Sequence, residues 1–151
     1  VVYAGRKKMI ANGGIVFASE EDTSVSPFEM NGTLYVPERA FSEIAGWGKA
    51  KTEYDSTGNI LYIYNYKIDK NSAEFEENNW YYTVVGSNEA YINGKAAWLS
   101  APVIASESGL WIPVSAFSEL MGRNVTPLGG GGYLIGGADR SLAETFIKYL
   151  H

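Results

Sequence analysis

The sequence predicts an α+β fold made of two tandem ββ-β-α-ββ repeats, with antiparallel sheets packed on short helices, plus a C-terminal helix. The pattern Pro-x-x-Ala-Phe-Ser-Glu-x-x-Gly occurs twice, at residues 37–46 and 113–122. An Asn-Gly dipeptide, a strong signal for a two-residue hairpin turn, precedes each copy at residues 12–13 and 93–94. We therefore predict a single module over residues 1–151, with a first repeat at 1–66, a connector at 67–79, a second repeat at 80–138 and a C-terminal helix at 139–151.

Apolar runs between turn signals predict the strands of each repeat. In the first repeat they cover residues 1–5, 8–11, 15–17, 34–36, 51–54 and 60–64, with 18–33 read as a loop. In the second repeat they cover 82–86, 96–98, 110–112, 124–128 and 133–135, and four glycines bridge the last two. The polar, acidic stretch between the repeats interrupts this order, which is why we interpret it as a connector.

Each copy of the repeated pattern predicts a short helix. Pro37 and Pro113 suit the first helical position, where no N–H donor is needed, and Gly46 and Gly122 suit a left-handed C-cap. Apolar residues at helical spacing form one stripe on each helix: Ala40, Phe41, Ile44 and Ala45 in the first copy, and Ala116, Phe117, Leu120 and Met121 in the second. The same spacing between residues 140 and 150 predicts the terminal helix.

The composition excludes several classes of function. The chain has a net charge of −5, which argues against a nucleic-acid partner, and no apolar run approaches the length of a membrane span. It has no cysteine and a single histidine, His151. Aromatic residues make up 14% of the chain, with 11 Tyr and 4 Trp, and such residues suit both sheets and binding surfaces. Because the sequence begins at Val1 without Met or a signal peptide, we expect a fragment or a processed product.

The pattern of residues in each half resembles that of the bacterial copper amine oxidase N-terminal-like domain. In the second half the resemblance rests on Val85, Gly86, Ser87, Ala90, Tyr91, Ile92, Asn93, Gly94, Lys95, Leu99, Pro102, Gly109, Leu110, Trp111, Ile112, Pro113, Phe117, Glu119, Leu120 and Gly122. In the first half it rests on Asn12, Gly13, Val36, Pro37, Arg39, Ala40, Glu43, Gly46, Tyr54 and Asp55. The second half departs from the family pattern where Ser115 replaces the arginine found at Arg39.

This resemblance implies a non-catalytic α+β module. Such modules are commonly appended to secreted or cell-surface proteins of Gram-positive bacteria, among them polysaccharide-degrading enzymes, and some similar modules serve as carbohydrate-binding modules. The copper and quinone of the family's namesake belong to another domain. We therefore expect no enzyme activity, no cofactor and no metal.

The residues themselves agree with this expectation. A copper site of the amine oxidase type needs three imidazoles, and a serine or cysteine triad needs a histidine within the fold. The acidic runs at 20–22 and 74–77 lie in predicted loops, where solvated carboxylates are the ordinary interpretation. The 55–59 segment lacks the alternating acidic ligands of an EF-hand loop, so we interpret it as a hairpin turn.

Outward-facing aromatic residues are the remaining candidates for function. A two-residue turn at 93–94 pairs Tyr91 with Ala96 and places Tyr91 and Trp98 on one face of the hairpin, opposite a core face of Ala90, Ile92, Ala97 and Leu99. The full set of candidate carbohydrate-binding residues is Trp98, Tyr91, Trp47, Trp80, Tyr81 and Trp111. The alternative is packing, because Ile10, Ile15 and Phe17 occupy the equivalent positions in the first half and the two apolar faces could meet.

We expect a carbohydrate-binding module of a secreted bacterial polysaccharide-degrading enzyme, located outside the cell or on its surface. Its partners would be a polysaccharide and a tethered catalytic domain. The polysaccharide could be anionic, such as xanthan, if basic residues gather at the site: Arg6, Lys7, Lys8, Lys49 and Lys51. The alternative is a structural spacer or protein-interaction domain of a cell-surface protein with no sugar site. The sequence leaves open the glycan, the parent protein, the oligomeric state and whether the repeats share a sheet.

Overall fold

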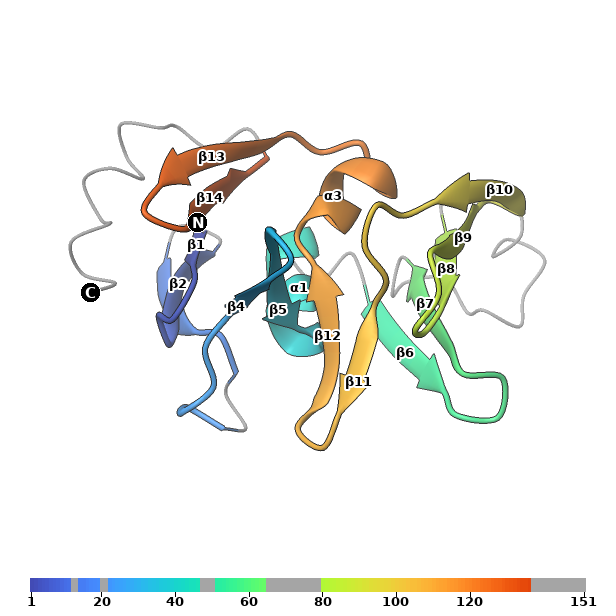
Figure 1. The fold of residues 1–151 in the computed structure, drawn as a ribbon, viewed down its shortest axis with the longest axis horizontal. Coiled ribbons are helices and arrows are strands. Elements are labelled where there is room, and N and C mark those ends of the chain that lie inside the picture. Colours follow the sequence, from blue (N-terminus) through green and yellow to red (C-terminus); the bar gives the residue numbers. More distant parts are fainter. Residues whose placement is uncertain (12–13, 20–21, 47–50, 65–79, 137–151) are drawn as a thin grey trace.

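The computed structural model describes residues 1–11, 14–19, 22–46, 51–64 and 80–136 (Figure 1). The predicted connector, C-terminal helix, Asn12-Gly13 turn and Trp47 lie outside these residues. The strands within them are β1 Val2–Tyr3, β2 Lys8–Ala11, β3 Gly14–Phe17, β4 Phe28–Met30, β5 Thr33–Pro37, β6 Lys51–Asp55, β7 Ile60–Tyr64, β8 Trp80–Val84, β9 Glu89–Ile92, β10 Lys95–Trp98, β11 Ile104–Ser106, β12 Gly109–Pro113, β13 Val125–Gly129 and β14 Gly132–Ile135. The helices are α1 Glu38–Gly46 and α3 Ser115–Glu119. Antiparallel sheets with few helices agree with the predicted α+β class.

The two halves of the chain are interleaved, because strands of one half pair with strands of the other. The central sheet has the order β11-β12-β5-β4, so its middle pair joins β5 of the first half to β12 of the second. A five-stranded sheet of order β10-β9-β8-β7-β6 adds the closing hairpin of the first half to the opening strands of the second. A three-stranded sheet of order β1-β14-β13 makes the reciprocal exchange. These two sheets lie at opposite ends of the molecule in Figure 1. The halves therefore do share sheets, a point that the sequence left open.

The prediction of a loop over residues 18–33 is wrong at its C-terminal end. β4 occupies Phe28–Met30 and pairs with β5 through a tight turn at Asn31 and Gly32, whose φ angles are 53° and 77°. Positive φ at both central residues is the geometry that Asn-Gly favours in hairpins. β11 was missed in the same way, because each of these edge strands has only three residues.

The predicted position of the two prolines is also wrong. Pro37 and Pro113 are the last residues of β5 and β12, and the helices begin after them at Glu38 and Ser115. A strand end tolerates a proline, because the strand's own ladder needs no donor beyond that point.

The apolar stripes of the helices meet in the core as predicted. The rings of Phe41 and Phe117 are both fully buried, and they stack on each other with centroids 4.2 Å apart. Gly122 has φ 67°, and its N–H donates to the Ser118 carbonyl at 3.0 Å, so the predicted left-handed cap forms after α3. The two helices, packed through their apolar stripes, thus join the two halves of the chain beneath the central sheet.

Replacing Phe117 by alanine is expected to lower the free energy of unfolding by about 3–5 kcal/mol, because it opens a cavity beneath Phe41. Urea denaturation followed by far-UV circular dichroism measures this change. Glu107→Ala, at an exposed turn, is the matched control and should shift stability by less than about 0.5 kcal/mol. A loss below about 1 kcal/mol for Phe117→Ala would contradict the assignment of the helix pair as the centre of the core.

Candidate functional site

The five-stranded sheet has one face in the core and one face turned away from it. Leu61, Thr83 and Ala90 occupy one row of paired positions on β7, β8 and β9, and all three are fully buried. Because successive side chains of a strand point to opposite faces, the residues on either side of this row point outward. We call this outward surface the aromatic face, because its central row is Tyr62, Tyr82 and Tyr91.

Those three tyrosines lie on neighbouring strands, and the ring of each contacts the ring of the next. Tyr62 pairs with Tyr82 and Tyr82 with Tyr91 in the strand register. The ring centroids are 5.9 Å apart in the first pair and 4.6 Å apart in the second, where the rings are within 19° of parallel. The Tyr82 and Tyr91 rings cover each other's faces and the Tyr62 ring is tilted by 45° to that of Tyr82, so the row presents ring edges and hydroxyl groups. Burial, followed by the neighbouring Tyr91 and Tyr62, raises the pKa of Tyr82, so this hydroxyl stays protonated at neutral pH.

Trp98 stands beside this row on the edge strand β10. It pairs with Glu89, while Ala96 pairs with Tyr91, which confirms the predicted register of the hairpin. The core side of the hairpin is also as predicted, since Ala90 and Leu99 are buried and Ile92 and Ala97 pack against the core. Trp98 is 68% exposed. Within the described part of the chain, no group accepts a hydrogen bond from its indole N–H. Among the aromatic side chains that the structure describes on this face, Trp98 has the ring most open to solvent.

A set of hydrogen bonds directly after Trp98 fixes the end of its strand. The Leu99 N–H donates to the Asn88 carbonyl at 2.8 Å, and the Asn88 side-chain amide donates to the Leu99 carbonyl at 2.7 Å. The Glu119 carboxylate on α3 then accepts both the backbone N–H and the hydroxyl of Ser100, each at 2.9 Å. Trp98 is thus an exposed side chain on a rigid backbone.

Of the other predicted residues, Tyr81 and Trp111 lie elsewhere, whereas Trp80 holds an outward position on β8, two residues before Tyr82. Tyr81 is half-buried and packs against the core on the opposite face of β8, and burial raises its pKa, partly offset by Arg123. Trp111 is 8% exposed, lies in edge contact with Phe28 at 4.8 Å and donates its indole N–H to the Ser106 hydroxyl at 3.0 Å. Trp80 pairs with Tyr64 in the strand register, and their side chains are outside the described set. The structure therefore brings together only Tyr91 and Trp98 of the predicted residues whose side chains it describes.

Sequence reasoning missed Tyr62 and Tyr82. Each alternates with a buried neighbour, which is a period-two signal that the sequence carries. The sequence carries no local signal for the pairing of β7 with β8. The polar connector between these strands indicates instead a boundary between the two halves. That pairing turns separate tyrosines into one row.

The two apolar hairpin faces do not meet, so that alternative is wrong. Phe17 pairs with Lys8 on the β2–β3 hairpin, as Trp98 pairs with Glu89 on β9–β10. The two hairpins belong to different sheets at opposite ends of the molecule (Figure 1). Phe17 is 38% exposed, and the Lys8 ammonium lies over its ring at 5.6 Å.

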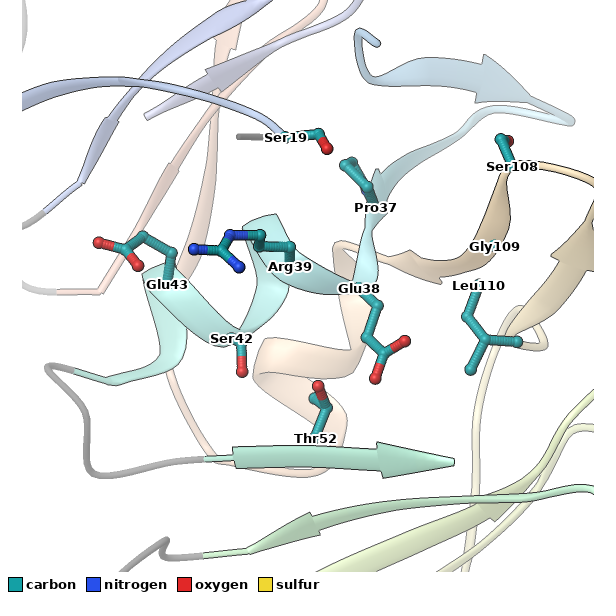
Figure 2. A pocket seen from close by; sticks show the side chains of 10 residues that line it. All are labelled: Ser19, Pro37, Glu38, Arg39, Ser42, Glu43, Thr52, Ser108, Gly109 and Leu110. Atoms are coloured by element: carbon teal, nitrogen blue, oxygen red, sulfur yellow. The ribbon is translucent and has the colours of Figure 1, made fainter. Parts of the chain in front are cut away.

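A polar cavity of about 520 Å³ lies away from the aromatic face (Figure 2). It is lined by α1, the start of β6 and the turn into β12, through Ser19, Pro37, Glu38, Arg39, Ser42, Glu43, Thr52, Ser108, Gly109 and Leu110. Hydroxyls, two carboxylates and one guanidinium could bind a polar ligand. The described lining includes no imidazole or thiol that could act as a nucleophile or base in acyl transfer.

Across the described residues, no group of three or more His, Cys, Asp or Glu side chains is placed to hold a metal ion. No helix in that part of the chain is long and apolar enough to cross a membrane.

The fold defines an α+β module of interleaved antiparallel sheets with an aromatic face at one end. The family model described as "Copper amine oxidase N-terminal domain" matches residues 15–132, so the chain belongs to that family. The N-terminal domain of copper amine oxidase is a non-catalytic domain. No curated protein and no solved structure matches the chain.

Replacing Glu119 by alanine is expected to speed amide hydrogen exchange at Ser100, because the acceptor of its N–H is lost. The cost in unfolding free energy should be about 1 kcal/mol, since these bonds lie at the surface. Exchange followed by NMR measures the first effect and urea denaturation the second. Ser118→Ala, at the preceding exposed position, should change neither. Unaltered exchange at Ser100 in Glu119→Ala would show that the carboxylate does not hold this segment.

Proposed function

We propose that this chain is a non-catalytic carbohydrate-binding module of a secreted bacterial polysaccharide-degrading enzyme, and that it binds polysaccharide on the aromatic face. The observation that carries the proposal is the 68% exposure of Trp98 beside the tyrosine row. Water-exposed indole is unfavourable unless a ligand covers it, and its apolar face suits the C–H face of a sugar ring.

The two kinds of aromatic contact have different roles. Trp98 supplies the stacking surface, because its ring is open. The tyrosine hydroxyls, each able to donate and accept, supply partners for sugar hydroxyls. Glu89, opposite Trp98, adds a carboxylate acceptor next to the stacked ring.

An estimate of the energy shows why both parts are needed. Covering about 100 Å² of indole contributes roughly 2.5 kcal/mol at about 25 cal/mol/Å². A dissociation constant of about 1 mM already requires about 4 kcal/mol. Trp98 alone falls short of this, so the tyrosine row has to contribute, and the site extends over several sugar units. In the parent enzyme, weak binding of this kind raises the effective concentration of substrate around a tethered catalytic domain.

The second candidate is a protein-interaction domain of a cell-surface protein. The outer edge of β10 favours it, because β10 is the last strand of its sheet and an edge strand can pair with a strand of another protein. Loss of sugar binding on changing Trp98 separates the two candidates, since strand pairing uses the backbone.

Trp98→Ala is expected to remove retardation of the protein in affinity electrophoresis through gels that contain soluble polysaccharide. The loss should be at least about tenfold in affinity, which corresponds to about 1.4 kcal/mol. Phe17→Ala is the matched control, because Phe17 holds the equivalent position of the other hairpin. Equal losses in the two variants would refute the site, and so would full retardation of Trp98→Ala.

Tyr82→Phe is expected to weaken binding by about 2- to 10-fold while leaving the ring stack in place, because it removes one hydroxyl worth about 0.5–1.5 kcal/mol. Isothermal titration calorimetry with the best polysaccharide of the panel measures this change. Tyr133→Phe is the control, since Tyr133 lies on β14, in the three-stranded sheet at the other end of the molecule. An effect of Tyr133→Phe as large as that of Tyr82→Phe would contradict the assignment of the binding face.

A further inference from the structure

The charges on the aromatic face are acidic where the side chains are described. Three carboxylates hold outward register positions. Glu53 pairs with Tyr62 at one end of the tyrosine row. Asp55 and Glu89 lie in the next row, where Asp55 pairs with Ile60 and Glu89 with Trp98. The exposed indole therefore has a carboxylate as its direct cross-strand neighbour.

Among the described side chains, no basic residues gather on this face. Lys95 pairs with Ile92 and so holds a position on the opposite face, at the tip of the hairpin. Lys51 holds an outward position on β6, the far edge strand, about 19 Å from β10 by strand spacing, and its side chain is not among the described ones. Lys8 lies over Phe17 at the other end of the molecule. The basic residues Lys8, Lys51 and Lys95 are therefore dispersed.

We infer that the polysaccharide bound on the aromatic face is uncharged, an inference that rests on the proposed function. A uronate stacked on Trp98 would bring its carboxylate within a few ångströms of Glu89, well inside the roughly 8 Å over which physiological salt leaves charges unscreened. Hydroxyl groups of a neutral sugar meet the same carboxylate as donors, and such charge-assisted hydrogen bonds are short and strong. Glu89 thus repels anionic polysaccharides and accepts hydrogen bonds from the hydroxyl groups of uncharged ones.

A cationic polysaccharide fits less well, because two of the three carboxylates are already engaged within the protein. The Asp55 carboxylate accepts the Thr57 backbone N–H at 3.0 Å in the hairpin turn, and Glu53 has an interaction partner of its own. Glu89 is left as a single acceptor beside one stacking ring. That arrangement selects hydroxyls on a neutral chain.

Affinity electrophoresis with three sets of gels tests the inference. One set holds uncharged polysaccharides (hydroxyethylcellulose, xyloglucan, galactomannan and xylan), one holds polyanions (xanthan and polygalacturonate), and one holds the polycation glycol chitosan. We expect retardation on at least one uncharged polysaccharide, at least tenfold stronger than on either polyanion, and its loss in Trp98→Ala. Tighter binding to a polyanion or to glycol chitosan that Trp98→Ala removes would overturn the uncharged class but keep the proposed function. No Trp98-dependent retardation on any gel would overturn the proposed function itself.

Glu89→Gln tests the stated cause. It should raise affinity for the polyanions severalfold and change affinity for the uncharged polysaccharide by less than about threefold, because the glutamine amide still accepts a hydroxyl. Glu107→Gln alters the net charge equally at an exposed turn away from the face and should leave both affinities unchanged. Equal behaviour of the two variants would show that Glu89 does not set the selectivity.

Discussion

The antiparallel pairing of β7 with β8 determines what this protein can present to a partner. It joins the last strand of the first half to the first strand of the second, and it places Tyr62 beside Tyr82. Two hydrogen bonds between Asn59 and Val85 hold its register. Asn59, with φ 54°, donates its side-chain amide to the Val85 carbonyl at 3.0 Å and accepts the Val85 N–H on its own carbonyl at 2.9 Å. A slip of one residue in this pairing would turn Tyr62 and Tyr82 to opposite faces of the sheet, so the position of this one turn keeps the tyrosines in one row.

The two ends of the molecule share a plan but differ in what covers their outer surfaces. At the end with β1, β13 and β14, a second apolar cluster of Val1, Tyr3 and Leu134 is buried, with Ile10 and Leu128 packed against it. At this end of the molecule, Ile10 occupies the hairpin position that Tyr91 occupies on the aromatic face. Tyrosine carries a hydroxyl that favours contact with water or with a polar ligand, whereas isoleucine favours full burial. At this matched position, tyrosine in place of isoleucine therefore adds a hydroxyl group to the outer surface of the aromatic face.

The sequence predicted what depends on local periodicity. Alternation around Asn93-Gly94 was enough to place Tyr91 and Trp98 on the outer face and Ala90 on the inner one, because a two-residue turn leaves a single register. The helix stripes followed from spacing in the same way. The sequence did not predict which strands pair across the connector, since that choice is made by tertiary packing. The sequence also did not predict the hairpin with its turn at Asn31-Gly32, because the three-residue strand β4 before the turn gives too short an alternating pattern to recognise.

The placement of Trp98 on an edge strand has a physical cost, which the proposed binding of a polysaccharide would offset. Edge strands invite pairing with other chains, and proteins keep them short or charged to prevent it. β10 has four residues and begins at Lys95 after a tight turn. Two residues after its end, the Ser100 backbone N–H donates to the Glu119 carboxylate. These features limit pairing along the edge while leaving the side chains of the strand exposed. A smaller or polar residue at position 98 would serve the edge better, so the fold itself does not call for tryptophan there. In the proposed function, the reason for tryptophan is a ligand whose apolar surface covers the ring, held by the hydroxyl groups that the β7–β8 pairing has set beside it.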